Sequence, residues 1–367
     1  MKKGFRKIRN LFSKRSVKIG VLVILAILLF LSFVVLFSLT LFKDSPVKKE
    51  KVVVVDVPLI KKKSLGVYDV KSNRRPIAIM IDNNVGNSNH VGLQDAYLSY
   101  EVIVEGGLTR IMAIFKDKDP AVIGPVRSSR HYFLDYALEN DAIYAHYGWS
   151  PYAENDIKAL GVNNINGLYD DYFYRDKNYR APHNVFTNLD KLYEGAKNLG
   201  YSVTSSNYQN LNYTAKNVSL KKLDKEMNCA NDVCALKGSV ASSVDIYYSN
   251  SETRSYKYDS ENKYYVRYMN GSIHKDRDSG IGYHYKNIII MRVNSRVFDS
   301  YGRYDVDTVS SGDGYYITNG YLRNIRWSKG SRSSKTSYTY SDGSRIKVND
   351  GNTFIQVVPI NSDINFS

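Results

Sequence analysis

Hydrophobic and polar residues follow four patterns along this chain, and each pattern predicts a different kind of structure. Residues 19–42 form an uncharged apolar run, and residues 43–73 are rich in lysine and contain two prolines. From residue 74 to residue 217, apolar runs of strand length alternate with segments of helical periodicity. After residue 217 the helical periodicity nearly disappears, and tyrosine-rich strand patterns follow one another.

The alternating region predicts an N-terminal mixed α/β domain. Gly106 and Gly107 between two apolar runs favour a hairpin, and Ser128 and Ser129 before an apolar stripe are typical of a capped helix start. Pro151 fits the first turn of a further helix. We expect strands at 75–82, 101–107, 110–116, 121–127 and 142–148, and helices at 93–100, 128–141, 150–161 and 188–200.

The tyrosine-rich region predicts a second, β-rich domain. We expect its strands within 244–249, 255–271, 286–295, 312–329 and 344–360. The sequence therefore predicts an α+β fold, preceded by one transmembrane helix. Its parts are the N-terminal domain at 74–217, a junction at 218–244 and the C-terminal domain at 245–362.

The N-terminus predicts a membrane anchor. Residues 1–18 carry eight basic residues and no acidic one, and the 24 uncharged residues after them would reach about 36 Å as a helix, enough to cross a bilayer core. No signal-peptidase motif follows, although a cleaved signal is the alternative, and no cysteine nearby could carry a lipid. We expect a cytoplasmic tail at 1–18, a transmembrane helix at Ile19–Phe42, an extracytoplasmic tether at 43–73 and the bulk of the chain outside the cell.

The charge of the chain bears on its partners. The 367 residues carry a formal net charge of +15, but taking the eight N-terminal cations from the 51 basic residues leaves 43 against 36 acidic ones. An exported domain is not expected to meet nucleic acid, and a mild positive balance suits a membrane surface or an anionic wall polymer. The 32 tyrosines fit either an AT-rich genome or an aromatic surface for sugars.

Two cysteines lie close together, at Cys229 and Cys234. Outside the cytoplasm they can form a local disulfide, and free thiols are the alternative. No further ligands for zinc lie near them, so we expect no metal site and no cofactor.

The segment "IGPVRSSRHYF" at 123–133 offers the strongest candidate chemistry. On a helix that starts near Ser129, Arg130 heads an apolar face, so its guanidinium needs an acceptor. One interpretation is an anion cradle built from Arg127, Arg130, the serines and the unpaired helix amides. The other is an internal ion pair of Arg130 with Glu105 or Asp82.

Other polar side chains follow the ends of predicted strands, where clefts form in α/β sheets, or gather in one loop at 174–187. The candidate ligand-binding residues are Asp82, Asn83, Glu105, Arg110, Arg127, Ser128, Ser129, Arg130, His146, Arg180, His183 and Asn184. No hydrolase or phosphate-loop motif is present. Whether the protein is an enzyme therefore stays open, and a binding function is favoured.

Several motifs together resemble the DUF3048 family of bacterial extracytoplasmic proteins, found mainly in Gram-positive bacteria. They include "RPIAIMIDNN", "YEVIVEGGLTRIMAIF", "IGPVRSSRHYFLDYA", "YRAPHNVFT" and, in the second half, "GDGYYITNGYLRNIRWSKG". The resemblance covers residues 74–360 and implies a two-part α+β structure at the outer face of the membrane. The family has no known function, so it assigns no residue a role. Its lipoprotein member has a lipidated cysteine where this chain has the apolar run.

These observations predict a membrane-anchored protein of the bacterial cell envelope that binds an anionic or glycan ligand, or an envelope-assembly partner. The alternative is a hydrolase or transferase acting on envelope polymers, with His146 or His183 as the base. A scaffold for other membrane proteins is a third hypothesis.

Overall fold

The computed structural model of the protein describes residues 25–33, 65–83, 89–209, 211–221 and 238–367. The chain divides into two units, Met1–Lys61 and Lys62–Ser367. In the first unit, residues 25–33 form a helix with exposed side chains, and the rest of the expected span and the cytoplasmic tail lie outside the described residues. Within the described ranges, no helix is both long and apolar enough to span a membrane. The single-pass anchor therefore stays a prediction.

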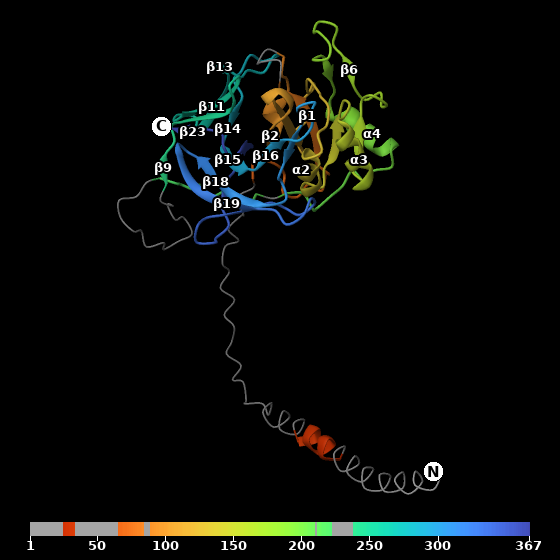
Figure 1. Ribbon diagram of the computed structural model, residues 1–367, viewed down its shortest axis with the longest axis vertical. Helices are drawn as coiled ribbons and strands as arrows, with labels where there is room; N and C mark the ends of the chain where they lie inside the picture. Colours follow the sequence, from red (N-terminus) through yellow and green to blue (C-terminus); the bar gives the residue numbers. More distant parts are fainter. Residues whose placement is uncertain (1–24, 34–64, 84–88, 210, 222–237) are drawn as a thin grey trace, which may run out of the picture. The chain divides into compact units, whose positions relative to one another are not determined.

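The second unit consists mainly of strands, which confirms the α+β class and the β-rich second half (Figure 1). Its helices are α2 (Phe133–Glu139), α3 (Pro151–Ala159) and α4 (Leu189–Asn198), with 3-10 turns η1 (Leu93–Asp95) and η2 (Glu105–Gly107). The strands of the first half are β1 (Ile77–Asp82), β2 (Leu98–Ile103), β3 (Thr109–Phe115), β4 (Ile143–His146), β5 (Asn164–Asn166), β6 (Tyr174–Arg175), β7 (Val185–Phe186) and β8 (Tyr213–Thr214). Those of the second half are β9 (Ser239–Val240), β10 (Ser243–Ser249), β11 (Glu252–Asp259), β12 (Tyr264–Met269), β13 (Ser272–Ile273), β14 (His284–Tyr285), β15 (Asn287–Val293), β16 (Ser295–Val297), β17 (Tyr304–Val306), β18 (Ser311–Thr318), β19 (Tyr321–Ser328), β20 (Ser337–Thr339), β21 (Val348–Asn349), β22 (Thr353–Pro359) and β23 (Ile364–Phe366).

One long sheet joins the two halves of the chain. Its strand order is β20-β19-β18-β15-β22-β2-β3-β1-β4-β5, with β9 paired to β19. Strand β22 runs parallel to β15 on one side and to β2 on the other, so the last third of the sequence hydrogen-bonds to the first. In the structure both halves share one sheet and belong to one compact unit. The division into two domains therefore stays a prediction from the sequence.

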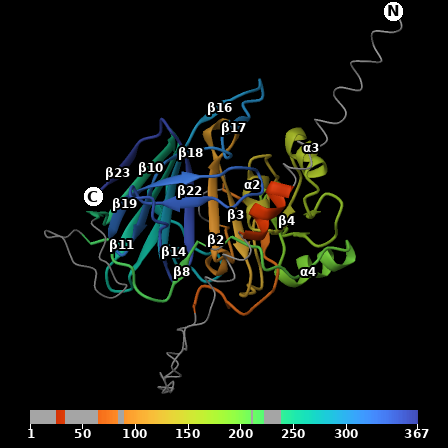
Figure 2. The same ribbon diagram turned by 90° about the horizontal axis from the view of Figure 1, so that it is seen from below.

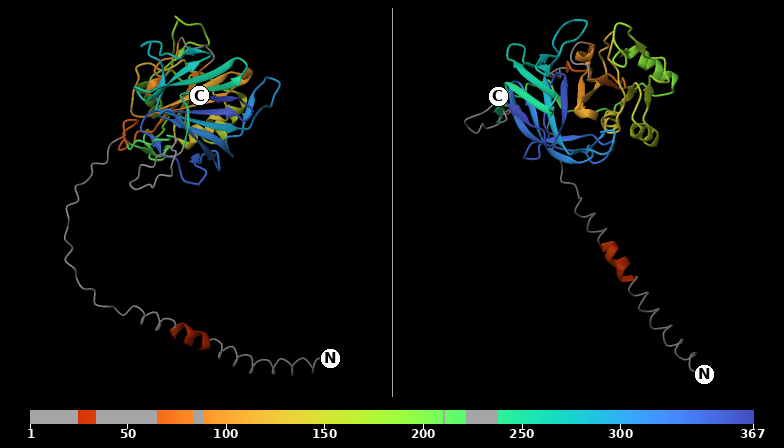
Figure 3. Two further views of the ribbon diagram at one scale, coloured as in Figure 1. Left: turned by 90° about the vertical axis from the view of Figure 1, so that its left-hand side faces the viewer. Right: turned by 45° about the horizontal axis from the view of Figure 1, so that its top comes forward.

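A second sheet, ordered β13-β12-β11-β10-β23 with β14 on β12, packs beside the β18–β22 part of the long sheet (Figure 2). Helices α3 and α4 lie at the other end of the unit, beyond β4 (Figures 2 and 3). The all-β half of the sequence therefore builds one side of the unit, and the helices cover the other.

Strand β2 shows why this arrangement is stable, because all six of its residues are buried. On one face, the ring of Tyr100 stacks on Tyr136 of α2 at 4.4 Å and its hydroxyl donates to Glu139. On the other face, Glu101 meets arginines of the second sheet. Neighbouring residues of a strand point to opposite faces, so β2 is the middle of three layers.

Three expected elements differ from the structure. The expected helix at 93–100 is only the turn η1, after which the chain enters β2. The expected strand at 121–127 makes only isolated bridges at Ile123, Gly124 and Val126. Residues 65–73, expected as tether, belong to the folded unit, because Val67 and Tyr68 are buried and the ring of Tyr68 contacts three other tyrosines.

Candidate functional site

The arginine-bearing segment crosses the carboxyl ends of β1 and β4 in an extended conformation. The Arg127 amide donates to Met80 O at 2.8 Å, the Tyr147 amide donates to Arg127 O at 3.0 Å, and the Ser129 amide donates to Gly148 O at 2.9 Å. These backbone hydrogen bonds fix residues 127–130 at the edge where strand ends gather. This is the place that the positions of the candidate residues predicted.

The predicted start of the helix after Ser128 and Ser129, with a serine as its cap, is wrong. Helix α2 begins at Phe133, its N-cap is Tyr132, and no side chain caps it. Ser129 is buried and its Oγ accepts from Tyr144 at 2.8 Å. The segment satisfies its amides by pairing with neighbouring strand ends, so it cannot be helical, and the amides of α2 do not join the arginines.

Arg130 forms an internal ion pair, as one of the two interpretations predicted. Its Nε donates to Glu105 Oε1 at 2.5 Å and its Nη2 donates to Oε2 at 2.8 Å, a two-pronged contact. Burial alone would raise the pKa of Glu105, but the hydrogen bond and charge of Arg130 outweigh it and lower that pKa. Arg130 is therefore a structural cation rather than a free one.

Arg127 and His183 share one buried carboxylate. The Nε of Arg127 lies 3.0 Å from Asp82 Oδ2, and His183 Nδ1 lies 2.6 Å from the same oxygen. The Asp82 side chain is 2% exposed, whereas those of Arg127 and His183 are 24% and 25% exposed. The contact of Arg127 is ionic rather than an aligned hydrogen bond, because its Nε has no hydrogen-bond partner among the described residues. We call Asp82, Arg127 and His183 the Asp82 cluster.

Arg110 adds a third guanidinium beside this cluster. Its residue faces Asp82 across the β1–β3 pair, and its Nη1 donates to Ser128 O at 2.6 Å. Burial and the nearby charge of Arg130 lower the pKa of Arg110 to about 10, so it remains charged at neutral pH. Three guanidiniums thus face the two carboxylates of Asp82 and Glu105, which leaves a positive surplus.

His146 does not join the Asp82 cluster, which corrects its expected place in a shared cleft. Its side chain is buried, with Nδ1 2.9 Å from Gly148 O and Nε2 3.3 Å from Asn164 Oδ1. Burial lowers the pKa of His146 to about 4, so the ring is neutral at pH 7. The neutral ring has one N–H to donate, and the shorter contact assigns it to Nδ1 and the carbonyl of Gly148, so His146 acts as a structural residue.

The predicted loop residues have separate roles. Asn184 is buried and ties the loop together, since its Oδ1 accepts from Arg175 at 2.7 Å and its Nδ2 donates to Asp176 O at 3.1 Å. Arg180 is exposed, and its carbonyl accepts from the His183 amide at 3.0 Å. Of the loop residues, His183 alone reaches the Asp82 cluster through its side chain. Cys229 and Cys234 lie outside the described residues.

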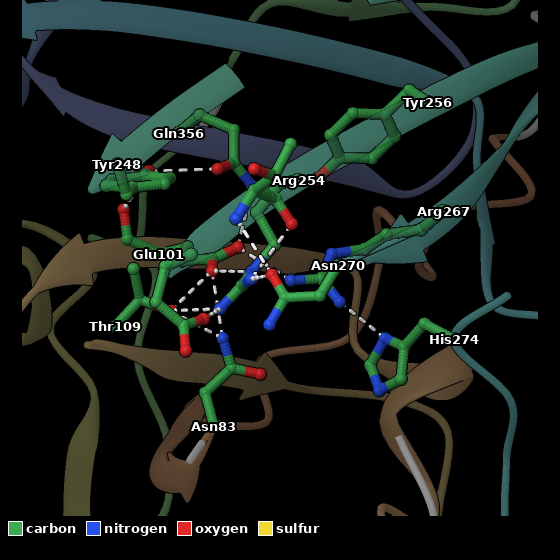
Figure 4. Close-up of polar contacts among 12 residues, drawn as sticks. Asn83, Glu101, Thr109, Tyr248, Arg254, Tyr256, Arg267, Asn270, His274 and Gln356 are labelled. Carbon is green, nitrogen blue, oxygen red and sulfur yellow. Dashed lines mark hydrogen bonds and ion pairs between the residues drawn. The ribbon is translucent and has the colours of Figure 1, made fainter. Parts of the chain in front are cut away.

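Sequence reasoning missed a buried charge network between the two sheets (Figure 4). Glu101 accepts from Arg254 at 2.6 Å and from Arg267 at 2.7 Å, and all three side chains are fully buried. Asn83, a predicted ligand residue, donates to the same carboxylate at 2.8 Å and so belongs to this network. Burial alone would raise the pKa of Glu101, but the charges of Arg267 and Arg254 lower it to about 2. A lone acid inside the apolar strand "LSYEVI" was the available signal.

Two buried histidines connect this network to the Asp82 cluster. Arg267 Nη1 lies 2.5 Å from His274 Nδ1, His274 Nε2 lies 2.9 Å from His90 Nδ1, and His90 Nε2 contacts the carbonyl of Asp82. A guanidinium only donates hydrogen bonds, so His274 Nδ1 must accept, and each later step must then donate toward Asp82. Both imidazoles are therefore neutral. This agrees with burial, which lowers the pKa of His90 to about 4 and that of His274 well below its usual value.

Among the described residues, no group of three histidine, cysteine or acidic side chains is placed to hold a metal ion. The fold and the cluster thus define a class: an α+β protein of two packed sheets with a polar cluster at one sheet end.

Two family models identify the chain more closely. The N-terminal domain model of the "Protein of unknown function (DUF3048)" matches residues 65–202, and the C-terminal domain model matches residues 244–355. The chain belongs to the DUF3048 family. The resemblance read from the sequence motifs is thereby confirmed.

A relative and its crystal structure agree with this assignment. The chain is 29% identical over 292 residues to the "Putative lipoprotein YerB" of Bacillus subtilis (strain 168), which covers 78% of this chain and 82% of that protein. The crystal structure of the YerB protein from Bacillus subtilis matches with a TM-score of 0.69 and 26% identity, over 83% of this chain and 100% of that one.

Proposed function

We propose that this protein lies at the outer face of a bacterial membrane and binds an anionic envelope ligand at the Asp82 cluster. The location rests on the relative named as a lipoprotein and on the basic N-terminus followed by an apolar run. The envelope outside such a membrane contains polymers with phosphate and carboxylate groups, so an anion receptor would meet its ligand there.

One observation carries the binding proposal: Arg127 is more exposed than Arg130, and within the described residues the carboxylate that it contacts, Asp82, is shared with His183. A carboxylate that serves two partners neutralises each of them incompletely. The terminal nitrogens of Arg127 can then donate two parallel hydrogen bonds to a phosphate or carboxylate. The neighbouring Arg110 and Arg130 add favourable potential while staying in their own contacts.

The test compares the variant Arg127→Gln with the wild-type protein for binding to poly(glycerol phosphate). Loss of a charge-assisted pair should weaken binding about tenfold or more. The matched control is Arg326→Gln on β19, whose side chain is 61% exposed and pairs with Asp313. Equal binding by Arg127→Gln and Arg326→Gln would contradict the proposal, as would a wild-type protein that binds no anionic polymer.

One observation favours a second candidate function, acid–base catalysis on envelope polymers. Asp82 holds His183 Nδ1 at 2.6 Å and leaves Nε2 as the ring nitrogen that a substrate could reach. Digestion of isolated cell walls by the wild-type protein, abolished in His183→Gln, would support this activity. Absence of released product from the wild-type protein would refute it and leave binding intact.

A further inference from the structure

A second open site lies apart from the Asp82 cluster. A cavity of about 700 Å³ opens between the start of α2 and the β16–β17 hairpin, and neither Arg127 nor His183 lines it. Its polar lining includes His131, Asp135, Asn294, Arg296, Asp305 and Arg332. Acidic, basic and uncharged hydrogen-bonding side chains therefore line a space large enough for a ligand of several rings.

The hairpin beside this cavity has an ordered tip. The Phe298 amide donates to Arg303 O at 2.9 Å, the Gly302 amide donates to Asp299 O at 3.0 Å, and Arg303 Nη1 donates to Asp299 Oδ2 at 2.7 Å. These contacts present Tyr301, which is 70% exposed, with the guanidinium of Arg303 4.3 Å from its ring centroid. An exposed aromatic ring on a locked turn loses little freedom on binding.

Aromatic rings from three parts of the sequence meet at the edge of the cavity. The rings of Tyr152 on α3 and Phe298 lie 4.8 Å apart, and that of His131, which lines the cavity, lies 6.1 Å from Tyr152 and 5.9 Å from Phe298. The side chain of Tyr152 is 41% exposed. We call His131, Tyr152, Phe298 and Tyr301 the aromatic ledge. His131 connects the ledge to the cavity lining, and the guanidinium of Arg303 lies 6.0 Å from the ring centroid of Tyr152 and 4.3 Å from that of Tyr301.

We propose that the cavity and the aromatic ledge bind an uncharged glycan chain. A pyranose ring has an apolar C–H face, which packs on aromatic rings, and an edge of hydroxyl groups, which need donors and acceptors together. The lining supplies three carboxylates, Asp135, Asp305 and Asp307, against the guanidiniums of Arg296 and Arg332. That excess of acid disfavours an anionic polymer here, in contrast to the positive surplus of Arg110, Arg127 and Arg130 over Asp82 and Glu105.

The test uses the full chain in a detergent without a sugar headgroup and the hexamer of N-acetylglucosamine as the probe. We expect wild-type binding in the millimolar range or tighter, and Tyr152→Ala and Tyr301→Ala each to weaken it about fivefold or more. The matched control is Tyr247→Ala on β10, because Tyr247 is also 41% exposed but lies outside the ledge. Its binding should equal that of the wild-type protein.

Three outcomes would overturn the proposal. The first is that the wild-type protein does not bind the hexamer at about 10 mM. The second is that Tyr247→Ala weakens hexamer binding as much as the ledge variants do. The third is that the ledge binds poly(glycerol phosphate) more tightly than the neutral hexamer. The variant Arg127→Gln separates the two sites, because it should bind the hexamer normally while losing the anionic polymer. Capture of a protein by the ledge without hexamer binding would also refute a glycan site.

Discussion

At the scale of single residues, this protein buries more charge than its sequence pattern suggests. Glu101, Arg254 and Arg267 have no exposed side-chain surface, and each charge is balanced by another within hydrogen-bond distance. Desolvating such a group costs several kcal/mol unless its partners stay in place. Removing one member should therefore destabilise the fold far more than removing an exposed charge.

The variant Glu101→Gln tests this directly. It removes the carboxylate that pairs with the buried Arg267 and leaves Arg254 with that of Glu252, so we expect the free energy of unfolding to fall by about 3–5 kcal/mol. Urea denaturation followed by circular dichroism measures it. Glu261→Gln in the exposed turn after β11 is the control and should change stability by less than about 0.5 kcal/mol. Similar losses in the two variants would show that the buried network contributes nothing special.

The buried histidines predict a pH dependence of stability. Burial lowers the folded-state pKa of His90 and His146 to about 4, and that of His274 also lies well below 6.5. The unfolded chain then binds more protons than the folded one between pH 6.5 and pH 4, so stability falls as the pH falls through this window. Each histidine should contribute about 1–2 kcal/mol of loss between pH 7 and pH 5.

Urea denaturation at pH 7 and pH 5 measures this loss. The lowered pKa of Glu101 costs stability mainly below pH 5, because a glutamate in the unfolded chain titrates at about pH 4.3. The variant His90→Asn should be less stable at pH 7 but should lose less between the two pH values. A variant with the same loss as the wild-type protein would mean that His90 does not titrate in this window.

At the scale of elements, the short helix α2 is held by the second half of the chain. Its Glu139 pairs with Lys329 at 2.9 Å, and both side chains are fully buried. Its Asp135 pairs at 2.5 Å with Arg332, which also contacts Asp156 at 2.7 Å near the end of α3. A seven-residue helix without a side-chain cap is unstable alone, so these ion pairs and its buried apolar face keep α2 in place.

Replacing Lys329 tests the role of this contact. Lys329→Met leaves Glu139 buried without its cation, and we expect a loss of about 3 kcal/mol in the free energy of unfolding. The exposed Lys335→Met nearby is the matched control and should be close to the wild-type protein. If both variants unfold at the same urea concentration, the second half of the chain does not hold α2 through this pair.

Local signals predicted some elements well and others poorly. Helices α3 and α4 were predicted because their helical pattern, with Pro151 in the first turn of α3, lies within a short stretch of sequence. The structure adds side-chain caps at Ser150 and Asn188. The start of α2 was wrong because backbone hydrogen bonds to β1 and β4 keep residues 127–130 extended, and no local pattern encodes those partners. The pairing of β22 with β2 joins residues about 250 positions apart, which periodicity cannot show.

The candidate site shows the same division. The positions of Asp82, Arg127 and His183 at the ends of strands or in loops predicted that they could meet, and the structure brings them together. Which arginine is neutralised by which carboxylate could not be predicted. Glu105 pairs with Arg130 because η2 places Glu105 beside it, and no local pattern shows this. The arginines of the Glu101 network come from the second half, so reading the first half alone missed them.

At the scale of the whole molecule, the two proposed sites differ in charge and would bind different parts of an envelope polymer. The Asp82 cluster together with the neighbouring Arg110, Arg130 and Glu105 has a positive surplus, and the cavity beside the aromatic ledge has an acidic one. Both are built by residues of the unit Lys62–Ser367, so one compact unit would suffice for binding. Because α2 and β22 tie the halves of this unit together, damage to either half should affect both sites.

The most direct test is an NMR titration of residues 62–367 with poly(glycerol phosphate), following the side-chain signals of Arg127 and His183. The signals are assigned by their absence from the spectra of Arg127→Gln and His183→Gln. The account predicts that both signals shift until binding saturates, while the signal of Arg326 does not move. Shifts that are uniform across exposed arginines, or none at Arg127, would contradict an anion site at the Asp82 cluster.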